Sequence, residues 1–214
     1  MNGLSLVLNF TIMKSALLSF IILVAFSIDM KAQENKPEIL MEPPTWAFEK
    51  FPLPPSFATA ITYKGFEELR FAPGMFKKDA HDYFTYVFVA QIDSSVVISQ
   101  EDVKNYLVNY YQGLCAITAK DRKLVIDTTK INAAVYRQKK STAKYATYDA
   151  VVNLFGVFTD GAPVTLNMEV SVIENAPDKK TWLFFIASPL HKKDETWKQL
   201  YSIRGRTLSR FNKL

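Results

Sequence analysis

Two stretches near the middle of the chain alternate between apolar and polar residues. On the first, Tyr145–Phe158, and on the second, Val164–Glu174, every other residue is apolar or small. Asp160-Gly161 lies between them and suits a tight turn. Because a period of two places alternate side chains on one face of a strand, this pattern predicts a β-hairpin.

Two other segments repeat with the period of a helix. Ser99 precedes the first, with Asp102 three residues later as in a capping box. Asp194 precedes the second. Their apolar residues are Val103, Tyr106, Leu107, Tyr110, Leu114 and Ile117 in the first, and Trp197, Leu200, Tyr201, Leu208 and Phe211 in the second. Each set lies on one side of a helix, so the spacing predicts two amphipathic helices.

Further strands are predicted by aromatic and β-branched content. They are Phe66–Phe71, Tyr83–Ile92, Leu124–Ile126 with Ala133–Arg137, and Thr181–Ala187. The last is apolar on both faces, which favours a central or doubly covered position. The order of elements predicts an α+β fold, a curved antiparallel sheet with two amphipathic helices packed on one face. We expect a single domain over residues 56–214.

The segment before this domain, residues 33–55, is rich in proline. Proline fixes φ and lacks a backbone donor, so we expect an extended arm rather than a helix or a central strand. Trp46, Phe48, Phe51 and Leu53 are interleaved with the prolines, and exposing them in a free linker would be costly. The arm is therefore expected to lie across the domain. The alternative is a proline-rich ligand for an aromatic groove on a partner.

Residues 1–32 have the features of a secretory signal peptide. Lys14 precedes an apolar run from Ala16 to Ser27, and Ala32 provides a small residue for cleavage. The true start is Met1 or Met13. The alternative is a retained membrane anchor, but the run is shorter than the roughly 20 residues that a spanning helix needs. We expect a bacterial protein exported to the periplasm or the cell exterior, with no membrane anchor after cleavage.

Composition and charge narrow the possible partners. The only cysteine, Cys115, lies far from the leader and inside a predicted helix, which excludes an internal disulfide and argues against lipid anchoring. Lys14, Lys31 and Asp29 would leave with the leader, so the net charge of +5 becomes +4. The basic residues are dispersed, and we expect no nucleic-acid partner. Two isolated histidines and the absence of a phosphate-binding or dinucleotide motif predict no metal site and no cofactor.

Two groups of residues are candidates for a site. The first is the segment Glu67-Glu68-Leu69-Arg70 with His81-Asp82 across the following loop. If the two strands form a hairpin, Glu68, Arg70, His81 and Asp82 can converge for binding or acid–base chemistry; the alternative is ordinary surface ion pairs. The second group is aromatic and lines either a ligand groove or the core. Its members are Tyr106, Tyr110, Tyr111, Tyr145 and Tyr148.

The segment PPSFATAITYKGFEELRFAPGMF, with the following DYFTYVFV, resembles a segment of exported bacterial proteins that carry no assigned activity. The likeness covers about Pro54 to Val89 and includes LRFAPGMF. It implies bacterial origin and export, and it brings no catalytic signature. The sequence therefore favours a non-catalytic binding or interaction domain that acts on a small molecule, a glycan or an envelope protein. The alternative is a small hydrolase using the Glu67–Arg70 and His81–Asp82 hairpin.

Overall fold

The computed structural model describes residues 36–139, 145–174 and 179–211, which form an open seven-stranded antiparallel sheet and two α-helices. The strand order is β1-β2-β3-β7-β6-β5-β4, so the α+β prediction is confirmed. The elements are β1 (Ala47–Leu53), β2 (Gly65–Phe71), β3 (Tyr86–Ile92), α1 (Gln100–Arg122), a 3-10 turn (Thr128–Lys130), β4 (Asn132–Arg137), β5 (Ala146–Phe155), β6 (Pro163–Ile173), β7 (Thr181–Ser188) and α2 (Glu195–Phe211). The predicted signal peptide lies outside the described residues.

The predicted hairpin is present as the β5–β6 pair. Its register runs from Ala146 opposite Val172 to Phe155 opposite Pro163. Gly161, in the connecting turn, has a φ of +74°, a conformation that favours glycine. The buried alternating residues of both strands belong to the larger of two cores, which also contains the buried side of α1.

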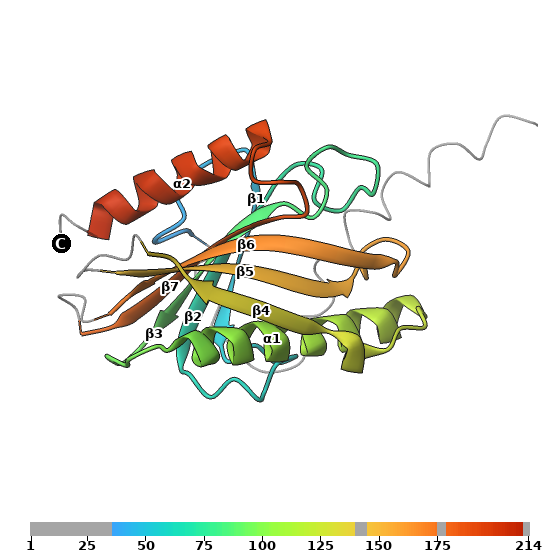
Figure 1. Ribbon diagram of the computed structural model, residues 1–214, viewed down its shortest axis with the longest axis horizontal. Coiled ribbons are helices and arrows are strands. Elements are labelled where there is room, and N and C mark those ends of the chain that lie inside the picture. Colours follow the sequence, from blue (N-terminus) through green and yellow to red (C-terminus); the bar gives the residue numbers. More distant parts are fainter. Residues whose placement is uncertain (1–35, 140–144, 175–178, 212–214) are drawn as a thin grey trace, which may run out of the picture. The chain divides into compact units, whose positions relative to one another are not determined.

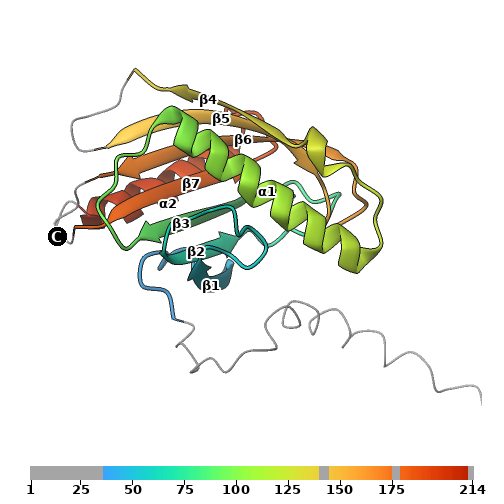
Figure 2. The same cartoon turned by 90° about the horizontal axis from the view of Figure 1, so that it is seen from below.

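The two helices lie on opposite faces of the sheet, so the prediction that both pack on one face is wrong. Figure 1 shows α1 and α2 on either side of the strands, and Figure 2 shows α1 crossing one face diagonally. Phe88 and Phe185 belong to the core on the α1 side, whereas Val89 and Phe184 belong to the core under α2. Because β3 and β7 are buried along their whole length, each face needs a cover of its own.

The proline-rich segment contributes β1, which forms one edge of the sheet and pairs with β2. An edge position suits Pro52, because an edge strand leaves one side without a ladder partner. Before β1, the chain buries Leu40 and Trp46 in the core under α2. In the part of the chain that the structure describes, neither helix has the length and apolar character needed to cross a membrane.

Candidate functional site

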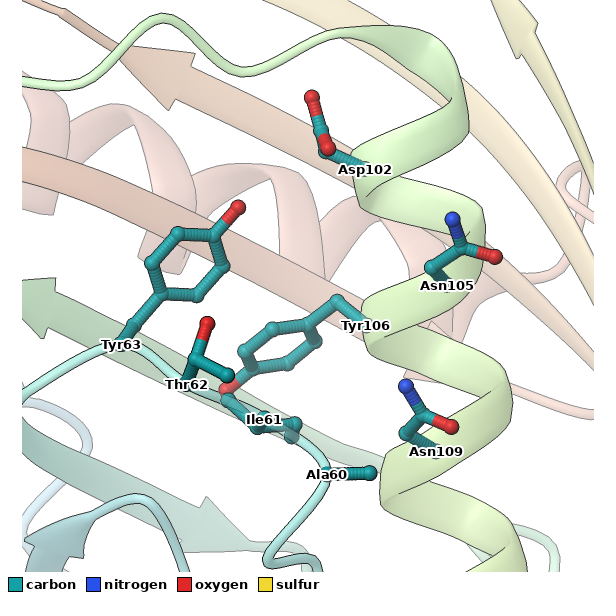
Figure 3. A pocket seen from close by; sticks show the side chains of 8 residues that line it. All are labelled: Ala60, Ile61, Thr62, Tyr63, Asp102, Asn105, Tyr106 and Asn109. Carbon is teal, nitrogen blue, oxygen red and sulfur yellow. The ribbon is translucent and has the colours of Figure 1, made fainter.

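A small pocket opens between α1 and the segment that connects β1 to β2. Its volume is about 160 Å³. Figure 3 shows it lined by Ala60, Ile61, Thr62 and Tyr63 on the segment, and by Asp102, Asn105, Tyr106 and Asn109 on α1. An apolar cavity of about 150 Å³ holds one benzene molecule, so this pocket suits a group of about six non-hydrogen atoms.

The side chains of α1 reach the pocket because of their spacing. Asp102, Asn105, Tyr106 and Asn109 are separated by three, four and seven residues from the first, and such positions share one side of a helix. Asp102 also belongs to the capping box, in which its Oδ2 accepts a bond from the Ser99 backbone N–H at 2.9 Å. The capping box therefore fixes the Asp102 carboxylate at the end of the pocket nearest the N-terminus of α1.

Close contact between backbones brings the other wall toward α1. A Cβ atom added at Gly113 would lie 1.8 Å from the carbonyl oxygen of Phe57, so only glycine allows this approach. The Phe57 ring packs edge-on against Tyr110 with centroids 5.1 Å apart. The pocket is thus bordered by a well-packed junction rather than by a free loop.

A buried carboxyl group lies beneath the pocket wall. The Tyr106 hydroxyl donates a hydrogen bond to Oε1 of Glu67, a residue of β2 that is fully buried. The other oxygen, Oε2, has no hydrogen-bond partner within the described part of the chain. Tyr106 therefore lines the pocket and also provides the hydrogen bond that holds Glu67.

Burial raises the pKa of Glu67 to about 8, although the Tyr106 and Tyr110 hydroxyls offset part of this rise. Burial is also the main cause that raises the pKa of Tyr106 well above its usual value, and Glu67 adds to it. At neutral pH Glu67 is accordingly protonated in most molecules. Tyr63, at the pocket, has a pKa raised by burial and by nearby Asp102.

Glu68 and Arg70, two predicted site residues, hold the N-terminal segment against the sheet. Glu68 accepts bonds from the backbone N–H groups of Glu38, Ile39 and Leu40 at 2.7, 3.0 and 2.9 Å. Arg70 donates to the carbonyl oxygens of Leu40 and Trp46, both at 2.9 Å. Both side chains are buried on the α2 side. Glu68 and Arg70 thus form a structural clasp that holds the N-terminal segment, and these contacts do not favour a role in hydrolysis.

His81 and Asp82, the other predicted site residues, make separate contacts. His81 Nε2 lies 3.0 Å from Asp194 Oδ1, and its side chain is 68% exposed. Asp82 Oδ2 accepts a bond from the Gly74 N–H at 3.0 Å. Among the described interactions, none joins this pair to Glu68 or Arg70. The structure therefore does not bring the four predicted residues together.

The predicted aromatic group divides between core and site. Tyr106, Tyr110, Tyr111 and Tyr148 are buried in the core on the α1 side, and only Tyr106 among them lines the pocket. Tyr145 is half-buried. Cys115 is buried in the same core, and burial raises the pKa of its thiol to about 11.

Sequence reasoning missed most of the pocket. Glu67 was part of the predicted segment, but Asp102, Asn105 and Asn109 were not selected as site residues. A signal was present, because these polar residues repeat at helical spacing beside Tyr106. The contribution of Thr62 and Tyr63 depends on how the connecting segment meets α1, and no local pattern reveals that contact.

A larger groove of about 720 Å³ lies between the β5–β6 turn end and the chain that follows α1. Its polar side chains already bond one another: Asn153 donates to Asn132 at 3.0 Å and accepts from Thr165 at 2.9 Å. We therefore regard the pocket beside α1 as the stronger candidate. Within the described residues, no group of three histidine, cysteine or acidic side chains is placed to hold a metal ion.

Comparisons with protein-family models, with curated proteins and with solved structures found no match to this chain. The geometry of the pocket is therefore the basis on which a function is proposed below. The likeness of the segment around Leu69–Phe76 to exported bacterial proteins stays a prediction.

Proposed function

We propose that this protein is an exported, non-catalytic binding domain, and that its ligand site is the pocket between α1 and residues 60–63. The observation that carries the proposal is that two amides, the Tyr63 phenol, a threonine hydroxyl, a carboxylate and the Tyr106 ring line a space of about 160 Å³. Ligand sites combine a concave surface with a few polar groups that fix orientation. The size of the pocket points to a small molecule, or to one small group of a larger glycan or protein.

The kinds of side chain at the pocket support binding rather than turnover. The residues that line it include no histidine, lysine, cysteine or serine that would pair as a nucleophile and its base. Asp102 is engaged in the helix cap, and Glu67 lies beneath Tyr106 with no exposed surface. The two amides and the Tyr63 phenol instead offer hydrogen bonds and a ring face, which are the means of recognition.

The test is to express the full chain in a Gram-negative host, recover it from the periplasm and record its native mass spectrum. We expect loss of the leader after Ala32 and additional mass bound to the mature chain. Asn109→Trp, which fills the pocket, should remove the bound mass. Ala116→Trp, on an exposed position of the same helix, is the matched control and should retain it.

Two results would contradict the proposal. An uncleaved leader in the cytoplasmic fraction would remove the export claim. Bound mass that persists in Asn109→Trp would place the ligand elsewhere on the molecule.

A further inference from the structure

The charged side chain that lines the pocket is acidic. Asp102 contributes a carboxylate, and no lysine or arginine is present among the described residues that line it. The nearest lysine on the helix, Lys104, pairs with Glu101 at 3.0 Å. Among the residues that line the pocket, an anionic ligand would therefore meet a like charge and no cationic side chain, whereas a cation would meet an opposite charge.

Two aromatic rings border the same space. Figure 3 shows Tyr63 on the connecting segment and Tyr106 on α1, with the Tyr106 ring directed toward Ile61 and Thr62. The Tyr106 ring is 3% exposed and stacks on Tyr110 and Phe185, so Tyr63 is the ring whose face can attract a cation in the pocket. Tyr63 and Asp102 are close enough for the charge of Asp102 to raise the pKa of Tyr63.

Glu67 adds a second acidic group behind the Tyr106 ring. Its Oε2 is buried and has no hydrogen-bond partner in the described structure, and its Oε1 is bonded to the pocket-lining Tyr106. While the pocket holds no ligand, a protonated Glu67 costs the fold little free energy, because no charge is buried. A positive charge in the pocket would favour the ionised form instead.

The groups that face Glu67 do not supply that positive charge. Tyr106 and Tyr110 reach it from α1, and Tyr86 on β3 interacts with it electrostatically. Glu49 on β1 is a further acid on this side, and burial raises its pKa. Tyr63, on the connecting segment, interacts with Tyr106. In the described structure no salt bridge joins Glu67 to a basic residue.

We propose that the pocket binds a small organic ammonium ion, and that Glu67 gives up its proton to solvent when the ion enters. This inference depends on the proposed function, because it names the ligand class of the same pocket. Binding of the cation and loss of the proton are linked, so each favours the other by the same factor. The affinity for the cation therefore rises with pH as Glu67 ionises.

The experiment uses three probes of one shape and different charge: propylammonium, 1-propanol and propionate. Each is titrated into the mature chain by isothermal calorimetry at about pH 6 and pH 9, in two buffers of different ionisation enthalpy. We expect propylammonium to bind and the other two to bind at least about tenfold more weakly. A close opposite charge lowers a carboxyl pKa by about 1–3 units, and Tyr106 intervenes here, so the affinity should rise roughly three- to tenfold between the two pH values.

Two variants separate the contributions. Glu67→Gln keeps the shape of the side chain and should abolish both the rise in affinity with pH and the release of a proton, while retaining binding. Asp102→Asn retains a capping oxygen and should weaken propylammonium binding at both pH values, while leaving its pH dependence. Proton release by the unaltered chain provides a readout that does not depend on the folding of any variant.

Equal binding of 1-propanol and propylammonium would overturn this inference, as would a pH dependence that persists in Glu67→Gln. If 1-propanol binds and Asn109→Trp prevents it, the pocket remains the ligand site and only its preference for cations fails. If none of the three probes binds and the exported protein carries no bound mass, the cation preference and the binding site both fail.

Discussion

The Tyr106 hydroxyl donates a hydrogen bond to Glu67 Oε1 from a ring that also lines the pocket beside α1. A single tyrosine thus connects a solvent-accessible pocket to a carboxyl group that has no exposed surface. Changes in the charge of Glu67 are therefore expected to affect the stability of the fold and the properties of the pocket.

The first prediction concerns stability and pH. The pKa of Glu67 is about 8 in the folded chain against 4.5 for an unperturbed glutamate. Because the folded-state value is the higher, the stability linked to this proton is fully present below about pH 4.5 and is lost as the pH rises to about 8. We would measure urea unfolding at about pH 5, 7 and 9. Between the lowest and the highest pH, the free energy of unfolding of the unaltered chain should fall by on the order of 4 kcal/mol relative to that of Glu67→Gln.

Parallel stability curves for the two proteins would contradict this account of Glu67. Glu174→Gln is a suitable control, since this glutamate is only half-buried and accepts a bond from the Ile98 N–H. The control should follow the pH dependence of the unaltered chain over the same range.

The second prediction concerns the clasp on the other side of the sheet. Glu68→Ala leaves the N–H groups of residues 38–40 without an acceptor and leaves buried Arg70 without its nearby negative charge. Removing one partner from a buried ionic cluster costs about 3–5 kcal/mol. Unfolding by urea should show a loss of this size, and limited proteolysis should cut the chain before β1.

The matched control for Glu68 is Glu195→Ala. Glu195 pairs with Lys198 on the exposed side of α2, with side chains 80% and 71% exposed. We expect its replacement to change stability by less than about 1 kcal/mol. Equal effects of the two substitutions would show that the clasp does not stabilise the fold.

The third prediction compares two glycines in helices. At Gly113 an added Cβ would lie 1.8 Å from the Phe57 carbonyl oxygen, whereas at Gly205 nothing lies within 4 Å. Gly205→Ala should stabilise the protein by about 0.5–1 kcal/mol through helix propensity. Gly113→Ala should destabilise it by roughly 1–3 kcal/mol, because the connecting segment must move away from α1. Thermal unfolding measures both, and shifts of the same sign would refute the close packing beside the pocket.

The fold was predictable where the pattern is local. The β5–β6 hairpin follows from alternation and Asp160-Gly161, and α1 follows from its apolar spacing and the Ser99 cap. The placement of the helices was not predictable from the sequence. A run such as Thr181–Ala187 indicates that both faces of a strand are covered, but it does not indicate which element covers each face. The run favours a central or doubly covered strand, whereas the predicted fold has both helices on one face. The curvature expected for the sheet stays a prediction.

The site was predictable only in part, for a physical reason. Glu67 and Glu68 are neighbours in sequence, but successive strand residues point to opposite faces, so one lies beneath the pocket and the other holds the N-terminal segment. Choosing between them requires knowledge of what packs on each face. Contacts between β2 and residues far away in the chain, such as Leu40 and Tyr106, provide that knowledge.

The most direct test of the binding site follows the side-chain amide signals of Asn105 and Asn109 in nitrogen-15 NMR spectra of the mature chain. Propylammonium is added first, followed by an extract of small molecules from the Gram-negative expression host. These two signals should shift on ligand addition, while the signal of the Asn132 side-chain amide, in the other groove, should stay unchanged. Shifts confined to Asn132, with Asn105 and Asn109 unaffected by every addition, would contradict the proposed binding site.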